Sequence, residues 1–140
     1  MGCAHRRPQR LSVKYLLDTH TFLWAAVDPE MLSAAATGAI ETTGAKLFLS
    51  AASLWEIGIL HSLRRIQLKL SIREVTDLSA SQLGTELLEI EPGHIDRMRE
   101  LPFHHRDPFD RLLIAQALDL KAVILGKDSS FDAYGVTRIW

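Results

Sequence analysis

Short apolar runs alternate with longer amphipathic segments along this chain. Five runs rich in Val, Ile and Leu have the length of strands, and they cover residues 13–17, 46–50, 87–90, 122–125 and 136–139. The last of them predicts an edge strand. The segments between the runs predict helices, at residues 19–27, 33–42, 52–63, 71–83, 93–101 and 107–118.

Two of the expected helices carry specific start signals. Ser71 and Glu74 have the spacing of a capping box. Asp107 followed by Pro108 combines an N-cap acceptor with proline at the first helical position. Because strands and helices alternate, the pattern predicts an α/β fold with a mainly parallel central sheet of four to five strands, covered by helices on both faces.

The size and composition are those of one globular domain. The chain has 140 residues, 47% hydrophobic and 24% charged, and a net charge of -1. We expect a single domain over residues 13–140, preceded by a disordered polar extension over residues 1–12. The lone Cys3 excludes an intramolecular disulfide. No apolar run is long enough for a signal peptide or a membrane span, so we expect a cytoplasmic location and no membrane partner.

Acidic residues stand where parallel strands are expected to end. Asp18 directly follows the first strand, Glu56 lies early in the helix after the second, and Asp128 lies just past the fourth. Asp107 and Asp110 lie in the first turn of the helix before that fourth strand. Ligands of such sheets bind beyond the carboxyl ends of the strands, so these carboxylates are expected to meet at one edge.

Carboxylates that meet must take up protons or share a cation. Mg²⁺ and Mn²⁺ prefer oxygen ligands and keep positions open for water and phosphate, which suits in-line hydrolysis of a phosphodiester. Other interpretations stay open for single residues. Asp18 could cap a helix, Asp107 is fully explained as an N-cap, Asp110 favours the helix dipole, and Asp128 could open a turn.

In the stretches that carry these acids, the chain resembles PIN domains, and more closely the VapC-type toxins of prokaryotic toxin-antitoxin pairs. The resemblance runs from about Lys14 to Trp140. Four stretches carry it, of which the third is the most specific: Tyr15–His20 (YLLDTH), Ser53–Ile57 (SLWEI), His105–Ala117 (HRDPFDRLLIAQA) and Lys127–Val136 (KDSSFDAYGV).

The resemblance implies a PIN-like three-layer α/β/α sandwich and an Mg²⁺- or Mn²⁺-dependent endoribonuclease. By position in the matching stretches, the residues implied as metal ligands and catalytic groups are Asp18, Glu56, Asp110 and Asp128. Asp107 is implied as an auxiliary acid. It further implies an RNA substrate, a homodimer, and a small antitoxin protein that blocks the site.

Basic residues offer candidates for binding phosphate. Arg111, beside Asp110, is expected to be an auxiliary residue that meets a phosphate or an antitoxin carboxylate; the alternative is that it pairs locally with an acid. A cluster of cations on one stretch could meet an RNA backbone or form a solvated face, and its members are Arg64, Arg65, Lys69 and Arg73.

The chain departs from the family pattern at two positions. Gly126 stands where relatives usually carry Thr or Ser, and His61 where many carry Lys. Because this hydroxyl is missing, a catalytically silent PIN-like module that binds RNA or protein remains an alternative interpretation. A receiver domain needs adjacent acids near the start and a Lys after the last core strand; Asp18 has no acidic neighbour, although Lys127 has the required position. A haloacid-dehalogenase-type phosphatase needs a second Asp at position 20, where this chain has His20.

Overall fold

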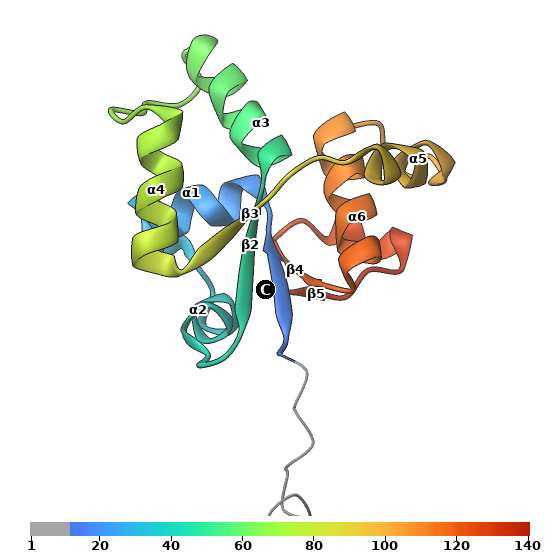
Figure 1. Ribbon diagram of the computed structural model, residues 1–140, viewed down its shortest axis with the longest axis horizontal. Helices are drawn as coiled ribbons and strands as arrows, with labels where there is room; N and C mark the ends of the chain where they lie inside the picture. Colours follow the sequence, from blue (N-terminus) through green and yellow to red (C-terminus); the bar gives the residue numbers. More distant parts are fainter. Residues whose placement is uncertain (1–11) are drawn as a thin grey trace, which may run out of the picture.

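The centre of the molecule is a five-stranded sheet in which every strand is parallel to its neighbours. The computed structural model describes residues 12–140, so the expected extension lies outside the described residues except for Ser12. The strand order is β3-β2-β1-β4-β5 (Figure 1). The strands are β1 (Lys14–Leu17), β2 (Lys46–Ser50), β3 (Thr85–Leu88), β4 (Val123–Leu125) and β5 (Arg138–Ile139). The expected parallel α/β sheet is confirmed.

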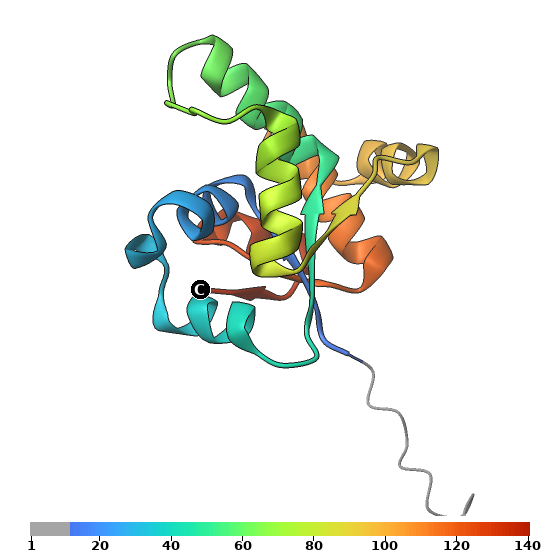
Figure 2. The same ribbon diagram turned by 60° about the vertical axis from the view of Figure 1, so that its left-hand side comes forward.

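Helices cover both faces of this sheet and make the expected three-layer sandwich (Figures 1 and 2). One face is covered by α1 (Thr19–Val27), α2 (Ala34–Glu41), α3 (Ala51–Ser62) and α4 (Ile72–Leu83). The other face is covered by α6 (Pro108–Leu120), with α5 (Pro92–Glu100) packed on α6. Two 3-10 helices complete the described chain, η2 (Pro29–Met31) and η3 (Ser129–Tyr134).

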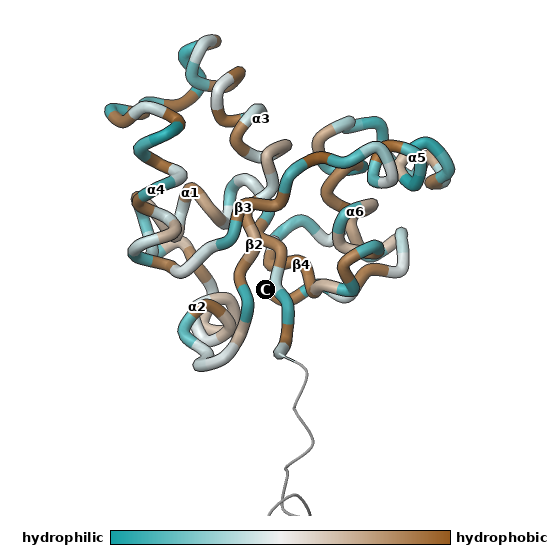
Figure 3. The backbone as a smooth tube through the Cα atoms, in the orientation of Figure 1, coloured by the Kyte–Doolittle hydropathy of each residue, from teal (hydrophilic) through white to brown (hydrophobic). Residues whose placement is uncertain are grey.

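The alternation of side chains along β1 explains the two cores. Tyr15 and Leu17 point into the core under α1 to α4, and Leu16 points into the core under α6. Both faces of a parallel sheet are buried, so its strands read as continuous apolar runs. Figure 3 shows the same distribution, with hydrophobic colour along the central strands and hydrophilic colour over much of α5.

The predicted helix starts are confirmed by their hydrogen bonds. In the capping box, the Glu74 backbone N–H donates to Ser71 Oγ at 3.1 Å and the Ser71 N–H donates to Glu74 Oε1 at 3.4 Å. Asp107 Oδ1 accepts from the backbone N–H groups of Phe109 at 2.9 Å and Asp110 at 3.2 Å. These caps place α4 and α6 as the sequence indicated.

The third strand differs from its prediction by two residues. It covers Thr85–Leu88 and not residues 87–90, because α4 ends at Gly84 in a left-handed conformation (φ 71°) and the chain enters the strand at once. β3 lies at the sheet edge, where Leu87 is 46% exposed. An edge strand therefore needs no continuous apolar run. Between residues 12 and 140 we find no helix with the length and apolar character that crossing a membrane requires.

Candidate active site

The five acids singled out in the sequence line one pocket at the carboxyl edge of the sheet. The pocket has a volume of about 230 Å³, and its lining comprises Asp18, Thr19, His20, Glu56, Asp107, Asp110, Asp128 and Phe131. Parallel pairing explains the meeting, since β1 and β4 are neighbours that end at the same edge. The Asp18 backbone N–H donates to the Leu125 carbonyl at 3.0 Å, which joins the ends of these two strands.

Asp18 is held in place as a helix cap and still faces the pocket. Its Oδ1 accepts a 2.7 Å hydrogen bond from the Thr21 backbone N–H, the N-cap bond of α1. Its side chain is buried, with 8% of the residue exposed. Burial raises the pKa of Asp18 above the usual value, and the charge of Asp128 adds to this, while hydrogen bonding from Thr21 and the charge of His20 oppose it. The Asp18 side chain therefore both caps α1 and lines the pocket.

Glu56 is oriented by a residue to which the sequence interpretation gave no role of its own. The Thr19 hydroxyl donates to Glu56 Oε1 at 2.6 Å and lies 3.1 Å from Ser53 Oγ. Thr19 is the first residue of α1, directly after Asp18, so one short segment supplies an acid and fixes a second one on α3. A hydroxyl beside the first acid was the only sequence signal for this contact.

Asp110 carries the strongest electrostatic perturbation in the pocket. Burial raises the pKa of Asp110 to about 7, and the negative charges of Asp107, Glu56, Asp18 and Asp128 all add to the shift. Asp107 uses its Oδ1 for the cap of α6 and still contributes the largest of these repulsions. The acids of four separate segments thus interact electrostatically, as the sequence interpretation required.

Asp128 lies at the exposed rim of the pocket. Its Oδ1 accepts a 2.9 Å hydrogen bond from the Ser130 backbone N–H, the N-cap bond of η3. Hydrogen bonding from Ser130 lowers the pKa of Asp128 below its ordinary value, and the positive charges of His105 and Arg138 lower it further. This carboxylate is therefore fully ionised at neutral pH, in contrast to Asp110.

Arg111 lies outside the pocket, so the structure does not support its expected auxiliary role toward a phosphate. Only 5% of the residue is exposed. Its guanidinium donates to the carbonyls of Pro102 at 2.9 Å, Met98 at 3.0 Å and Leu101 at 3.1 Å, and lies 4.1 Å from the centre of the Phe103 ring. Its donors are used to hold the end of α5 against α6.

The donor set of the pocket suits a hard divalent cation. All its acids offer oxygen ligands, and their mutual repulsion would be relieved by positive charge. Within residues 12–140, no three His, Cys, Asp or Glu side chains are already arranged to hold a metal ion. Mg²⁺ commonly keeps several waters and uses one or two carboxylates directly, so a closed protein cage is not required for binding.

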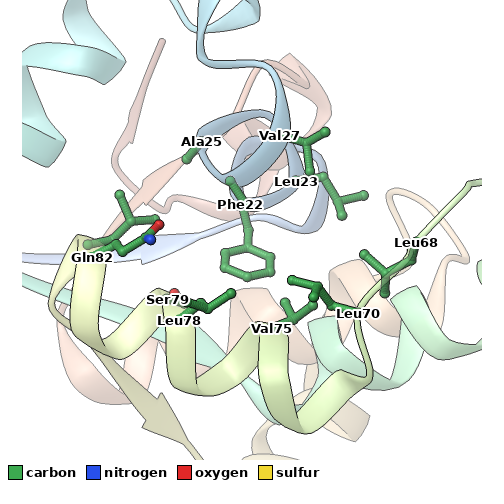
Figure 4. Close-up of a pocket in the computed structure, with 12 residues that line it drawn as sticks. Phe22, Leu23, Ala25, Val27, Leu68, Leu70, Val75, Leu78, Ser79 and Gln82 are labelled. Carbon is green, nitrogen blue, oxygen red and sulfur yellow. The ribbon is translucent and has the colours of Figure 1, made fainter.

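A second pocket, between α1 and α4, has a different chemical character (Figure 4). Its labelled side chains are mostly apolar and include Phe22, Leu23, Val75 and Leu78, with Gln82 at one end. It holds no titratable side chain and lies apart from the acids. This pocket offers contact area for an apolar ligand and no catalytic groups.

Fold and site together define an α/β protein with an acidic pocket at the carboxyl edge of a parallel sheet. The family model described as "PIN domain" matches residues 15–136. The chain belongs to the PIN domain family. Among curated proteins, it is similar to "Ribonuclease VapC22" of Mycobacterium tuberculosis (strain ATCC 25618 / H37Rv), with 32% identity over 114 residues, 81% of this chain and 85% of the relative.

Solved structures share the fold at low sequence identity. One is VapBC2 from Rickettsia felis bound to a DNA fragment from their promoter, with 13% identity and a TM-score of 0.68, covering 91% of this chain and 98% of that chain. Another is DNA-bound VapBC from Salmonella typhimurium, with 12% identity and a TM-score of 0.65, covering 91% and 97%. These likenesses confirm the PIN-like sandwich expected from the sequence.

Proposed function

We propose that this protein is an endoribonuclease that depends on Mg²⁺ or Mn²⁺ and acts as the toxin of a toxin-antitoxin pair. The observation that carries the proposal is the meeting of Asp18, Glu56, Asp110 and Asp128, from four segments, in one pocket. Burial, and after it repulsion between the acids, raises the pKa of Asp110 there to about 7. The relative named ribonuclease VapC22 supports the same activity and substrate class.

In this proposal Asp18, Glu56, Asp110 and Asp128 would hold the cation, either directly or through its water ligands, at the place where an RNA phosphate would bind. When bound, the cation lowers the pKa of a water ligand and stabilises the charge that develops on the phosphate during in-line hydrolysis. Asp18 is fixed for this task by its bond from Thr21 and Glu56 by its bond from Thr19. Asp107 acts indirectly, since it caps α6 and so fixes the backbone that carries Asp110.

An RNA substrate needs positive charge near the acidic pocket, because the chain as a whole has a net charge of -1. Arg64, Arg65 and Lys69 lie exposed in the segment that follows α3, the helix of Glu56. In the part of the chain that the structure describes, none of these three cations forms an ion pair. They support binding of a phosphate backbone that continues from the pocket along α3.

The proposal includes a homodimer and an antitoxin protein, because exposed apolar side chains are available for such partners. Trp55 on α3 is 61% exposed and packs edge-on against Phe109, with 5.1 Å between ring centres. Val27 and Leu78 are exposed beside the apolar pocket of Figure 4. Light scattering that gives the mass of a single chain would contradict the homodimer.

The activity is tested by incubating purified protein with structured and single-stranded RNAs. We expect internal cleavage with Mg²⁺ or Mn²⁺ and none with excess EDTA. The proposed reaction depends on a cation held by the acids of the pocket and uses no nucleophilic side chain. Cleavage that persists after chelation would contradict metal dependence. RNA binding without cleavage under every condition would favour the catalytically silent module.

The Thr19–Glu56 contact gives a first mutational prediction. Thr19→Val removes the hydroxyl that donates to Glu56 Oε1 and keeps the side-chain shape. Loss of such a supporting hydrogen bond is expected to weaken Mn²⁺ binding by about 10- to 100-fold, as measured by isothermal titration calorimetry. Thr19→Ser keeps the hydroxyl and serves as the matched control. Equal Mn²⁺ affinity in all three proteins would show that Thr19 does not orient Glu56 for the metal.

A further inference from the structure

The end of β4 comes unusually close to the Asp18 carboxylate. Gly126 directly follows β4 and is buried. A Cβ added at this position would lie 2.6 Å from Asp18 Oδ2 and 3.0 Å from Asp18 Cγ. Cβ atoms essentially never lie this close to other heavy atoms, so a side chain at position 126 would require the Asp18 carboxylate or the backbone to shift.

The backbone at Gly126 is fixed from both sides. Its N–H donates to the Ile139 carbonyl at 3.2 Å, and its carbonyl accepts from Arg138 Nη1 at 3.0 Å. The Arg138 guanidinium is itself fixed, because it donates to both carboxylate oxygens of Asp132, at 2.9 and 3.0 Å. A side chain at position 126 would therefore displace the Asp18 carboxylate before it displaced this backbone.

The Asp18 carboxylate is held by contacts on two sides. Its Oδ1 receives the 2.7 Å bond from the Thr21 N–H, and its Oδ2 lies against Gly126. Rotation away from position 126 would strain or break the bond to Thr21. The two contacts together define one position for a buried side chain that faces the acidic pocket.

We infer that Gly126 is a positioning residue for Asp18. Because glycine has no side chain, the Asp18 carboxylate can lie against the end of β4 and face the pocket while it caps α1. The inference deepens the proposed function and rests on it where metal binding is concerned. It also changes the interpretation of this position, because glycine here is a packing requirement and not only a lost hydroxyl.

The test uses Gly126→Ala, which adds a methyl group without a hydroxyl, and Gly126→Ser, which adds both. Gly38→Ala in α2 is the matched control, since a Cβ there would meet nothing within 4 Å. In the metal-free proteins, the ¹⁵N–¹H signal of the Thr21 amide reports the bond to Asp18. We expect this signal to shift in both position-126 variants and to stay in place in the control.

Metal binding gives the second readout, by calorimetric titration with Mn²⁺. We expect about tenfold weaker binding in Gly126→Ala, no recovery in Gly126→Ser, and native affinity in Gly38→Ala. Native Mn²⁺ affinity in Gly126→Ala, tighter binding in Gly126→Ser, or an unmoved Thr21 amide would overturn the inference. If the unmodified protein bound no Mn²⁺ at all, the proposed function would fail, and the Thr21 amide alone would decide the role of Gly126.

Discussion

Asp110→Asn is expected to lower the rate of RNA cleavage by roughly a thousandfold while leaving the protein folded. The substitution removes the charge of one of the four proposed metal ligands, the carboxylate whose pKa is raised by burial and by the charges of the other acids. Metal assistance contributes several kcal/mol to phosphoryl chemistry, and a loss of about 4 kcal/mol corresponds to a fall in kcat/KM of roughly a thousandfold. The measurement is the initial rate of cleavage of a labelled RNA at fixed Mn²⁺.

The stability of the same variant distinguishes lost chemistry from lost folding. The pKa of Asp110 rises from 3.8 to about 7 on folding, so between these values the unfolded chain ionises first and native stability falls as pH rises. Asparagine does not ionise. Without metal, the free energy of unfolding of Asp110→Asn should therefore equal that of the native protein near pH 3.8. Above pH 7 it should be higher by roughly 1–2 kcal/mol, a value that already allows for solvent screening.

Two outcomes of these measurements would count against the proposed site. If Asp110→Asn cleaved RNA at the native rate, Asp110 would not be a ligand or a catalytic group. If the variant were less stable than the native protein at every pH, the repulsion between Asp110 and its neighbours would not exist in solution. Urea denaturation across the pH range without metal measures the second quantity.

The parts of the fold that the sequence predicted are those that depend on local patterns. β1, β2 and β4 are buried on both faces and read as apolar runs, and the caps at Ser71 and Asp107 act within one turn of their helices. The site followed from one topological fact, that parallel strands end at the same edge. The acid directly after β1 and the acid just after β4 then meet because these two strands are also neighbours in the sheet.

The features that the sequence could not predict are contacts with the backbone or between distant segments. The partners of Arg111 are three carbonyl groups at and after the end of α5, and a carbonyl acceptor has no residue type to mark it. The closeness of Gly126 to Asp18 joins the ends of β4 and β1, far apart in the chain. Sequence patterns indicate which residues share an edge, and packing decides how closely they approach.

Arg111→Met is expected to have the largest effect on stability among these substitutions. The guanidinium makes three hydrogen bonds to carbonyls and lies over the Phe103 ring, and methionine keeps much of the volume without any donor. Hydrogen bonds to charged groups contribute about 1.5–3 kcal/mol each, and unpaired carbonyls that regain water recover part of this. We expect a net loss of about 3 kcal/mol, or roughly 10 °C in Tm.

Metal binding separates this structural role from a direct role in the site. Because Arg111 does not line the acidic pocket, Arg111→Met measured well below its Tm should bind Mn²⁺ with native affinity. Arg111→Lys should recover little of the lost stability, since one ammonium group cannot reach three carbonyls in the geometry of the guanidinium fork. If Arg111→Met had native stability but no longer cleaved RNA, Arg111 would instead bind the phosphate directly, as its position beside Asp110 in the sequence suggested.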